Sequence, residues 1–505
     1  MNILQALRDR NLLGSALIGN PASWQAWRSF LAAFFGLPMD GPATELYAQC
    51  TNRQESPQGA FRRGYLIAGR GAGKSYVCSL IVTYLACFVD WSRGLALGGR
   101  PVVLLVAPTT EQAKIDLGYI RGILDGSPIL RHMVANTTAS SVELRTRTGI
   151  VEIQVVSANY RSIRGRAICA AVVDESAFLR QEESSQPDVE IVNAITPALG
   201  RFGKRGVLLV VSTPYSRRGV LYQAYRKYFG SEDADSICWL APTLVMNPSF
   251  DQDVINEALA EDPARAAAEY LCEWRSDIES FIALEAIEGC VVRGVREIPP
   301  AAGIQYHGFV DASGGGQDSF TMGVSHRRMD GVIVLDCVRE VRPKFSPDSV
   351  TAEFAGVFKA YRITKIFGDD YAGEWPKERF AKNGILYESI GKPRSDLYKE
   401  FAPLLHSARV ELLDNQRMVA QIHGLERRVH PGGRDAINHA PNSHDDVANA
   451  AAGAVVLATF AKQPMVISDA MLRRASLPAG GYLSSNVRPP VTFVGSISDR
   501  FGARQ

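Results

Sequence analysis

Aspartates in the carboxy-terminal half stand where apolar runs end or a late apolar segment begins. They are Asp311, Asp369, Asp370, Asp445 and Asp446. Carboxylates brought together from such positions can hold two divalent ions about 4 Å apart, which clamp the attacking and leaving oxygens of a phosphodiester. All-oxygen ligation suits hard ions such as Mg²⁺ or Mn²⁺. We therefore predict a two-metal hydrolytic site. Any one aspartate could instead be a turn former or a helix cap, and Asp445 is well placed as an N-cap.

A glycine-rich segment in the amino-terminal half has the chemistry of a phosphate-binding loop. It runs Ala68-Gly69-Arg70-Gly71-Ala72-Gly73-Lys74-Ser75, between an apolar run and a helical segment from Tyr76 to about Val89. Glycines such as Gly71 and Gly73 let backbone N–H groups approach phosphates. Lys74 would reach the β- and γ-phosphates, and the Ser75 hydroxyl would hold Mg²⁺. The segment predicts an ATP site. Because Ala68 replaces the first glycine of the strict motif, a chance glycine-rich turn is the alternative.

Two further apolar runs end in residues that would complete an ATP-hydrolysing site. Ile168–Val173 precedes Asp174 and Glu175, and Val207–Val211 precedes Ser212 and Thr213. Asp174 would belong to the Mg²⁺ shell, and Glu175 would polarise the attacking water. The hydroxyls of Ser212 and Thr213 would sense the γ-phosphate and transmit its loss. The three motifs in this order predict a P-loop ATPase.

Hydrolysis of ATP also needs positive charge near the developing transition state. Arg70 lies inside the phosphate loop and would act within its own subunit. A basic cluster of Arg161, Arg164 and Arg166 precedes the strand of Asp174. One of these would reach a neighbouring subunit's ATP or contact DNA phosphates, and a solvated basic loop is the alternative.

The elements that must carry the ATP motifs alternate along the chain. Apolar runs at Tyr65–Ala68, Val102–Ala107, Val151–Val156, Ile168–Val173 and Val207–Val211 are separated by longer helical segments. Several runs are apolar throughout, which is typical of parallel strands covered on both faces. We predict a P-loop (RecA-like) α/β domain with a mostly parallel sheet over residues 61–275, after a helical lead-in over 1–60.

The acids near the carboxyl end require a second unit. Residues 276–303 include Pro299-Pro300 and predict an interdomain linker. The strand of Asp311, with Phe320–His326 and Val332–Val338, predicts an antiparallel meander. The RNase H-like arrangement has one acid on the first strand, one after a later strand, and one or two on a late helix. We therefore predict an RNase H-like domain with a mixed sheet over residues 304–462. Residues 463–505 are rich in Gly, Ser and Pro and predict a flexible tail.

Composition excludes several classes of protein. The 505 residues are 46% hydrophobic and 21% charged, with a net charge of +2, so any DNA-binding charge must be local. The eight cysteines show no Cys-x-x-Cys pair, which disfavours zinc ribbons and disulfide frameworks. Charges among the first ten residues exclude a signal peptide, and no apolar run reaches the ~20 residues of a membrane span. The composition predicts a soluble intracellular protein.

In both halves, the chain resembles the large terminase subunit of tailed bacteriophages, from about Trp24 to Phe460. The segments that carry the resemblance are Gly69–Ser75, Val173–Glu175, Val211–Pro214, Asn247–Ser249, Gly368–Trp375 and His444–Ala450. The resemblance implies an ATPase that pumps double-stranded DNA into a procapsid and a nuclease that cuts concatemeric DNA. It also implies a ring of five subunits on the portal protein, a small terminase subunit as partner, and residence in the cytoplasm of the infected cell rather than in the mature virion.

Site residues follow from the same resemblance by position. Lys74 and Ser75 bind ATP and Mg²⁺, Asp174 is the Walker B acid and Glu175 is the catalytic base. The nuclease metal ligands are Asp311, Asp369 and Asp445, with Asp446 as an accessory and Asp370 as the alternative to Asp369. Arg164 is the candidate trans-acting arginine. Trp24–Arg28 is a candidate adenine pocket, with a surface amphipathic helix as the alternative.

Two other functions fit part of this pattern. A helicase or other DNA-remodelling ATPase would keep the ATP motifs but give the carboxy-terminal acids no joint role. A structural virion protein with a vestigial ATP site would not need Lys74, Asp174 and Glu175 together. Assays for ATP hydrolysis and for Mg²⁺-dependent plasmid cleavage separate these functions from a terminase.

Overall fold

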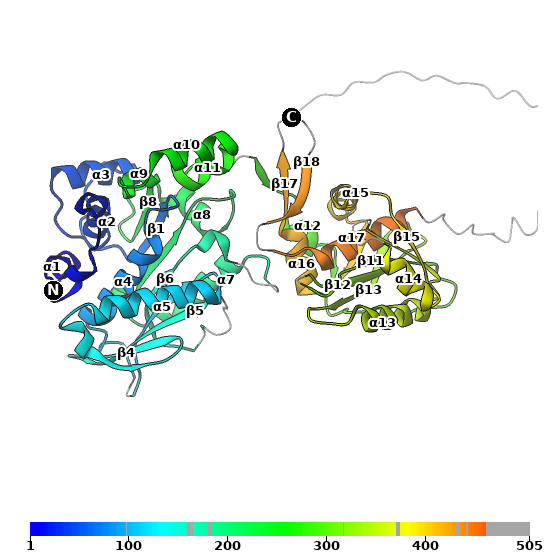
Figure 1. Ribbon diagram of the computed structural model, residues 1–505, viewed down its shortest axis with the longest axis horizontal. Coiled ribbons are helices and arrows are strands. Elements are labelled where there is room, and N and C mark those ends of the chain that lie inside the picture. The colour runs from blue at the N-terminus through cyan, green and yellow to red at the C-terminus, as the bar shows by residue number, and fades with distance from the viewer. Residues whose placement is uncertain are drawn as a thin grey trace, which may run out of the picture. The chain divides into compact units, whose positions relative to one another are not determined.

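A computed structural model describes residues 1–96, 98–158, 163, 165–179, 184–275, 277–316, 318–369, 374–429, 435–440 and 443–460. Two large sheets, each flanked by helices, and one small three-stranded sheet make up the described part (Figure 1). The predicted helical lead-in contains α1 (Ile3–Arg8), α2 (Gln25–Phe34) and α3 (Gly41–Thr51). Side-chain caps begin α1 at Asn2 and α3 at Asp40.

The first sheet is mostly parallel, as the apolar runs predict. Its order is β3-β4-β5-β2-β6-β7-β1-β8, and the pairs from β5 to β8 are parallel. The strands are β1 (Arg63–Ala68), β2 (Val102–Ala107), β3 (Val134–Thr137), β4 (Ser141–Thr146), β5 (Gly149–Ser157), β6 (Ile168–Val173), β7 (Val207–Ser212) and β8 (Ser236–Ala241). The antiparallel strands β3 and β4 and the edge strand β8 were not predicted from the sequence.

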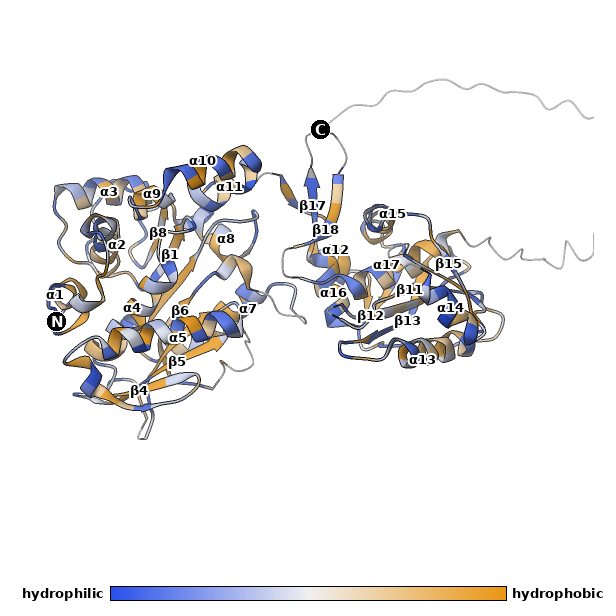
Figure 2. Ribbon diagram, in the orientation of Figure 1, coloured by the Kyte–Doolittle hydropathy of each residue, from blue (hydrophilic) through white to orange (hydrophobic). Residues whose placement is uncertain are grey.

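Helices cover both faces of this sheet because successive strand residues point to opposite sides. One face packs on α4 (Lys74–Phe88) and α5 (Thr110–Asp125), where Leu66 and Leu105 meet Leu80. The other packs on α7 (Pro187–Gly200) and α8 (Gly219–Tyr228), where Ile67 meets Ile191. Figure 2 shows the strands as predominantly hydrophobic and the outer helices as mixed. Beyond β8 follow α9 (Thr243–Met246), α10 (Gln252–Glu261) and α11 (Pro263–Leu271).

The second sheet is mixed and contains the predicted meander. Its order is β10-β16-β13-β12-β11-β14-β15, in which β11, β12 and β13 pair antiparallel and β14 is parallel to β11. The strands are β10 (Val291–Val292), β11 (Tyr306–Asp311), β12 (Phe320–Arg327), β13 (Ile333–Val341), β14 (Lys365–Gly368), β15 (Leu386–Ser389) and β16 (Val410–Leu413). A separate small sheet contains β9 (Ile278–Ser280), β17 (Leu425–Val429) and β18 (Asp435–His439).

Two layers of helices enclose the second sheet. One face carries α13 (Pro347–Ala360) and α14 (Trp375–Lys382), and the other carries α15 (Arg394–His406), α16 (Gln416–His423) and α17 (Asp446–Thr459). Helix α17 approaches the strands closely because its contact side is built from small residues. A Cβ on Gly453 would lie 2.4 Å from the Phe309 ring, so only glycine permits this approach. The start of α17 is thereby fixed beside the carboxyl end of β11.

The segment predicted as a linker, 276–303, is not irregular throughout. It contains β9, α12 (Leu284–Glu288) and β10, and β10 pairs with β16 of the second sheet. Ile282, Ile287 and Cys290 are buried in the core of the second unit. These segments are short, so their apolar residues show no helical or strand period in the sequence. Part of the predicted linker therefore packs with the second sheet.

The structure bears on membrane spans and on the cysteines. None of the described helices is both long and apolar enough to cross a bilayer. All eight cysteines are free thiols, and seven are buried while Cys87 is partly buried. Residues 463–505, predicted as a tail, lie outside the described residues.

Candidate active sites

Three strands bring the ATP motifs together at one edge of the first sheet. The phosphate loop follows β1, Asp174 follows β6, and Ser212 ends β7, which lies between β1 and β6. The register places Val173 beside Val210 and Ile67 beside Ser212. Since the carboxyl ends of parallel strands share an edge, residues far apart in sequence become neighbours there. Gly71 and Gly73 have φ values of +79° and +89°, which side-chain-bearing residues rarely adopt.

Side chains from outside the loop bond three consecutive loop carbonyls. Thr243 Oγ1 donates to the Arg70 carbonyl at 2.8 Å, Asn247 Nδ2 to that of Gly71 at 2.9 Å, and Trp27 Nε1 to that of Ala72 at 2.9 Å. Carbonyl oxygens repel phosphate oxygens, whereas loop N–H groups attract them. The three bonds therefore hold the loop in the conformation suited to an anion. Trp27, from the predicted adenine segment, acts here on the loop itself, and adenine binding by Trp24–Arg28 stays a prediction.

Lys74 and Glu175 meet between the loop and the ends of β6 and β7. Lys74 Nζ donates to Thr213 Oγ1 at 2.7 Å and lies 3.6 Å from Glu175 Oε1. Ser212 Oγ donates to Glu175 Oε2 at 3.1 Å. Glu175 has a φ of +46°, which costs a non-glycine residue about 1–2 kcal/mol. Backbone strain of this kind clusters at functional sites, so it marks Glu175 as a candidate functional residue beside the loop.

Asp174 is buried and has one carboxylate oxygen that the described chain leaves unsatisfied. Within the described part of the chain, its Oδ2 has no hydrogen-bond partner. Burial raises the pKa of Asp174, and the neighbouring Glu175 raises it further, while the Ser75 hydroxyl lowers it. An unpaired buried carboxylate oxygen is costly unless a cation completes it. Asp174 and Ser75 therefore fit a Mg²⁺ ion that accompanies ATP.

Asp116 is a further carboxylate of this region that the sequence analysis did not identify. It lies on α5, is fully buried, and accepts a hydrogen bond from Gln112 at 3.0 Å. Its Oδ2 has no hydrogen-bond partner in the described chain. Burial raises the pKa of Asp116 to about 6. Nothing in the local sequence distinguishes Asp116 from the surface acids of an amphipathic helix.

Of the candidate arginines, Arg70 lies in the described part of the chain and Arg164 does not. Arg70 forms an ion pair with Glu269 of α11 at 3.0 Å, and 63% of its side chain is exposed. Arg164, like Arg161, lies outside the described residues. The assignment of a trans-acting role to Arg164 therefore stays a prediction.

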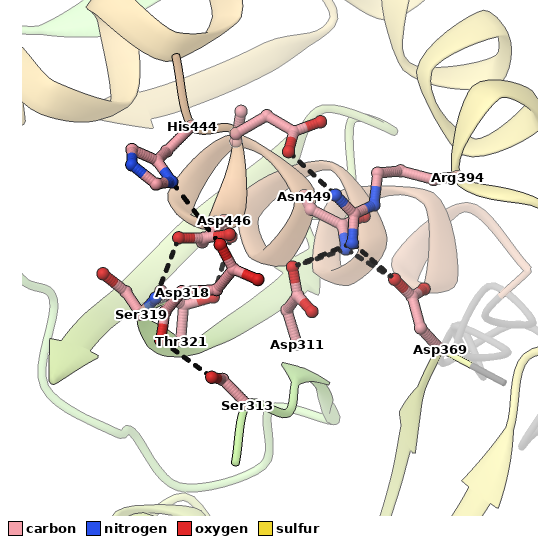
Figure 3. Close-up of polar contacts among 12 residues, drawn as sticks. Asp311, Ser313, Asp318, Ser319, Thr321, Asp369, Arg394, His444, Asp446 and Asn449 are labelled. Carbon is pink, nitrogen blue, oxygen red and sulfur yellow. Dashed lines mark hydrogen bonds and ion pairs between the residues drawn. The ribbon is translucent and has the colours of Figure 1, made fainter. Parts of the chain in front are cut away.

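The acids of the second unit also meet at a strand edge, on β11 and β14. These strands are parallel neighbours with Val310 beside Gly368, so Asp311 and Asp369 occupy corresponding positions. Asn449 of α17 joins them, because its Nδ2 donates to Asp311 Oδ2 at 2.9 Å and to Asp369 Oδ2 at 2.8 Å (Figure 3). The alternative ligand, Asp370, lies outside the described residues.

Asp445 faces the same cluster from the start of α17. It occupies the N-cap position, yet its side chain makes no capping hydrogen bond. Instead it accepts from Arg394 Nη1 at 2.8 Å and from the Tyr398 hydroxyl at 2.8 Å, both from α15. Arg394 Nη2 also lies 3.4 Å from Asp369 Oδ2 and 3.6 Å from Asp311 Oδ2. The three predicted ligands therefore surround one guanidinium, and a purely capping role does not explain Asp445.

The accessory residue Asp446 lies at the edge of this cluster. Its Oδ2 accepts from the Ser319 backbone N–H at 3.0 Å, and His444 lies 3.6 Å from Asp318 nearby. These acids line a cavity of about 420 Å³ that also exposes Arg394 and Trp375. A cavity of this volume holds far more than a single water molecule.

Burial dominates the electrostatics of the cluster. It raises the pKa of Asp311, Asp369 and Asp446. Arg394 opposes the shift at Asp311 and Asp369 because its positive charge stabilises the ionised carboxylates. The carboxylates raise the pKa of Arg394 in return, so its guanidinium stays charged.

A divalent ion fits the chemistry of these side chains. Among the described residues, no three acids, imidazoles or thiols are already spaced as a metal cage, because Arg394 stands between the carboxylates. Asp369 Oδ1 is nevertheless buried with no hydrogen-bond partner in the described chain. The available ligands of the cluster are carboxylate oxygens, and one of them has no hydrogen-bond partner among the described residues. Such a ligand set suits Mg²⁺ or Mn²⁺.

Sequence analysis missed the roles of several residues in this site. Asn449 lies four residues after Asp445 in the segment His444–Ala450. Because residues four apart share one face of a helix, that spacing could have indicated a shared site. Arg394 and Tyr398 begin a different helix, and no local pattern relates them to Asp445.

Comparisons with known proteins agree with the first half of this description. Residues 44–272 match the family model described as "Uncharacterized protein MJ0330, N-terminal P-loop domain". Curated proteins contain no significant match to this chain.

Solved structures similar to the chain include three phage proteins. The large terminase of bacteriophage HK97 is 15% identical, with 86% of this chain and 99% of that one covered and a TM-score of 0.39. The large terminase nuclease of thermophilic phage G20c is 16% identical over 35% of this chain and 96% of that one, with a TM-score of 0.31. The large terminase ATPase domain of Thermus phage P74-26, a mutant form, is 16% identical over 46% and 98%, with a TM-score of 0.34.

The resemblance expected from the sequence is thus found among solved structures, while the function proposed below rests on the two sites themselves. The amino-terminal half of this chain is a P-loop domain, and the chain as a whole is similar to phage large terminases.

Proposed function

We propose that this chain is a DNA-packaging enzyme that joins an ATPase to a metal-dependent endonuclease, as a terminase large subunit does. The observation that carries the proposal is the convergence of Asp311, Asp369 and Asp445 in a chain that also has a phosphate loop with Lys74 and Glu175. A phosphate loop alone would fit many ATPases. Three carboxylates at one sheet edge add the chemistry of phosphodiester cleavage.

The residues of the first site divide the work of ATP hydrolysis. Lys74 binds the phosphates in place of its present contacts with Thr213 and Glu175. Asp174 and Ser75 would hold Mg²⁺, which when bound neutralises phosphate charge. Glu175 then accepts the proton of the attacking water, while Ser212 fixes the orientation of its carboxylate. Because Ser212 and Thr213 contact Glu175 and Lys74 directly, a change at the phosphates reaches β7.

In the second site, Asp311, Asp369 and Asp445 would hold divalent ions, with Asp446 beside them. Bound metal would supply Lewis acidity and a more acidic water at the scissile phosphate. Asn449 keeps Asp311 and Asp369 in a fixed relative position, and Tyr398 does the same for Asp445. The substrate we propose is double-stranded DNA.

Partners belong to the proposal as well. We propose a ring of five subunits on a portal protein, a small terminase subunit that selects DNA, action in the cytoplasm of the infected cell, and Arg164 as the arginine supplied between subunits. The helicase alternative shares the first site but gives the carboxylates of the second no role.

Two assays on the purified chain test the proposed function. We expect DNA-stimulated, Mg²⁺-dependent ATP hydrolysis and plasmid cleavage in Mg²⁺ or Mn²⁺ from the same preparation. ATP hydrolysis with no cleavage at any divalent-ion concentration would favour the helicase alternative.

Metal binding in the second site should depend on pH. Because burial raises the pKa of Asp311 to about 8, protons compete with the metal near neutral pH, and burial also raises the pKa of Asp369 and Asp446. We expect Mn²⁺ affinity to rise between about pH 6 and pH 9 and binding to release protons. Calorimetry in buffers of different ionisation enthalpy measures the Mn²⁺ affinity and the number of protons released. An affinity that is flat with pH, with no proton release, would show that the carboxylates are already ionised.

Asn449 should act as a positioning residue. In Asn449→Leu, Asp311 and Asp369 lose a shared donor and repel each other, so we expect Mn²⁺ affinity to fall about 10- to 100-fold, the range for lost supporting hydrogen bonds. The control is Ser325→Ala, which removes a buried hydrogen bond to the Ala454 carbonyl farther along α17. If both variants bind Mn²⁺ alike and melt alike, Asn449 has only a packing role.

A further inference from the structure

Arg394 occupies the centre of the second site. Its Nη1 lies 2.8 Å from Asp445 Oδ1, and its Nη2 lies 3.4 Å from Asp369 Oδ2 and 3.6 Å from Asp311 Oδ2. One guanidinium thus contacts all three predicted metal ligands. Figure 3 shows Arg394 and Asn449 reaching the carboxylates from separate elements.

The arrangement around Arg394 is specific. Arg394 begins α15, and Tyr398 one turn later bonds the other oxygen of the same Asp445 carboxylate. Asp369 Oδ2 receives hydrogen bonds from Asn449 and Arg394, whereas its Oδ1 is buried and has no partner in the described chain. The cluster is therefore satisfied on the oxygens facing Arg394 and Asn449, while Asp369 Oδ1 has no partner among the described residues.

Charge explains why a cation is favoured between these carboxylates. Three buried carboxylates at one sheet edge repel each other strongly at low dielectric, and a positive charge between them offsets that repulsion. In the absence of metal, the guanidinium supplies this charge. A divalent ion coordinated by the same three oxygens cannot coexist with a guanidinium within hydrogen-bond distance of them, because like charges would then meet at close range.

We propose that Arg394 is the resident counter-ion of the carboxylate cluster and that a divalent ion binds by displacing its guanidinium. This inference rests on the proposed nuclease function. With 29% of its side chain exposed on the 420 Å³ cavity, Arg394 has a path out of the cluster. Arg394 and a divalent ion therefore compete for the same carboxylate oxygens.

Mn²⁺ binding to the full-length chain tests the displacement directly. Free Mn²⁺ is counted by electron paramagnetic resonance without ATP, at about pH 8.5 to limit proton competition. Sites that Asp311→Asn removes are assigned to the cluster. We expect Arg394→Gln to bind Mn²⁺ at these sites about tenfold more tightly than the wild type or better, because no cation has to leave.

A matched control separates competition from general electrostatics. Lys399→Gln removes one positive charge from the same helix, but Lys399 pairs with Asp396 at 3.0 Å and not with the cluster. We expect its Mn²⁺ affinity to equal that of the wild type. An equal gain in both variants would overturn the inference, since it would reflect net charge alone.

A second measurement uses the unmodified chain, so it holds even if Arg394→Gln does not fold. Phenylglyoxal modification of Arg394, followed by peptide mass spectrometry, should increase severalfold when Mn²⁺ is added, as the guanidinium leaves its carboxylates. In Asp311→Asn, Mn²⁺ should have no such effect.

The outcomes are distinguishable. Tighter binding by Arg394→Gln with Mn²⁺-dependent exposure of Arg394 supports displacement. Equal or weaker binding by a folded Arg394→Gln, or modification of Arg394 that Mn²⁺ leaves unchanged in a wild type that binds Mn²⁺, overturns it while leaving the nuclease proposal intact. Absence of cluster-site Mn²⁺ binding in the wild type and in every folded variant overturns the nuclease proposal and the inference with it.

Discussion

Replacing Asp311 with asparagine should abolish plasmid cleavage in Mg²⁺ and in Mn²⁺ while ATP hydrolysis stays within about twofold of the wild type. Asp311 is a metal ligand in our proposal, and its carboxylate also offsets the charge of the bound ions. Asparagine keeps the size of the side chain but removes that charge. ATP hydrolysis is spared because the phosphate loop belongs to a different sheet.

The matched control for this variant is Asp330→Asn in the same unit. Asp330 lies between β12 and β13, is exposed, and pairs with Arg328 rather than with the cluster. The Asp330→Asn variant should cleave DNA at the wild-type rate. Cleavage by Asp311→Asn at the wild-type rate would remove Asp311 from the metal site.

Replacing Glu175 with glutamine should lower the kcat of ATP hydrolysis by about 10² or more, the range of a lost general base. ATP affinity should stay near the wild-type value, because Lys74 and the loop are unchanged. The glutamine amide can still bond Ser212, so β7 keeps its position. Stopped-flow nucleotide binding and steady-state phosphate release measure the two quantities separately.

Glu143→Gln is the corresponding control. Glu143 lies on β4, away from the loop, and pairs with Arg100 at 2.9 Å. Its turnover should match the wild type. If Glu175→Gln also turned over ATP normally, another group would have to be the base, and Asp116, which acts electrostatically on Asp174, is an unassigned carboxylate of this region.

Much of this architecture was predictable because the relevant residues end continuous apolar runs. Strands such as β2 and β6 are buried on both faces, so their sequences are unbroken Val, Leu, Ile and Ala. Where such a run stops, the next residue emerges at the sheet edge. That simple relation placed Asp174, Asp311 and Asp369 correctly at strand ends.

What could not be predicted depends on contacts between distant segments. Trp27, Thr243 and Asn247 bond three neighbouring loop carbonyls, across sequence separations of 45, 173 and 176 residues. No local period relates such residues. Their roles follow only from the sheet that brings α2, α9 and the loop together.

The packing of the predicted linker could not be predicted for a different reason. Pro299-Pro300 marks a true break in regular structure, but the short elements before it are held by burial of single residues such as Ile282 and Ile287. Elements of two to five residues are too short to display a hydrophobic period. Tertiary packing, rather than local propensity, holds these elements in place.

The most direct test of two independent active sites in one chain is a single reaction in which plasmid cleavage and phosphate release are measured together. We expect the wild type to show both activities, Glu175→Gln to lose phosphate release but still cut DNA in Mn²⁺, and Asp311→Asn to lose cutting but still release phosphate. Loss of both activities in either folded variant, or cleavage that survives Asp311→Asn, would contradict the assignment of the two sites.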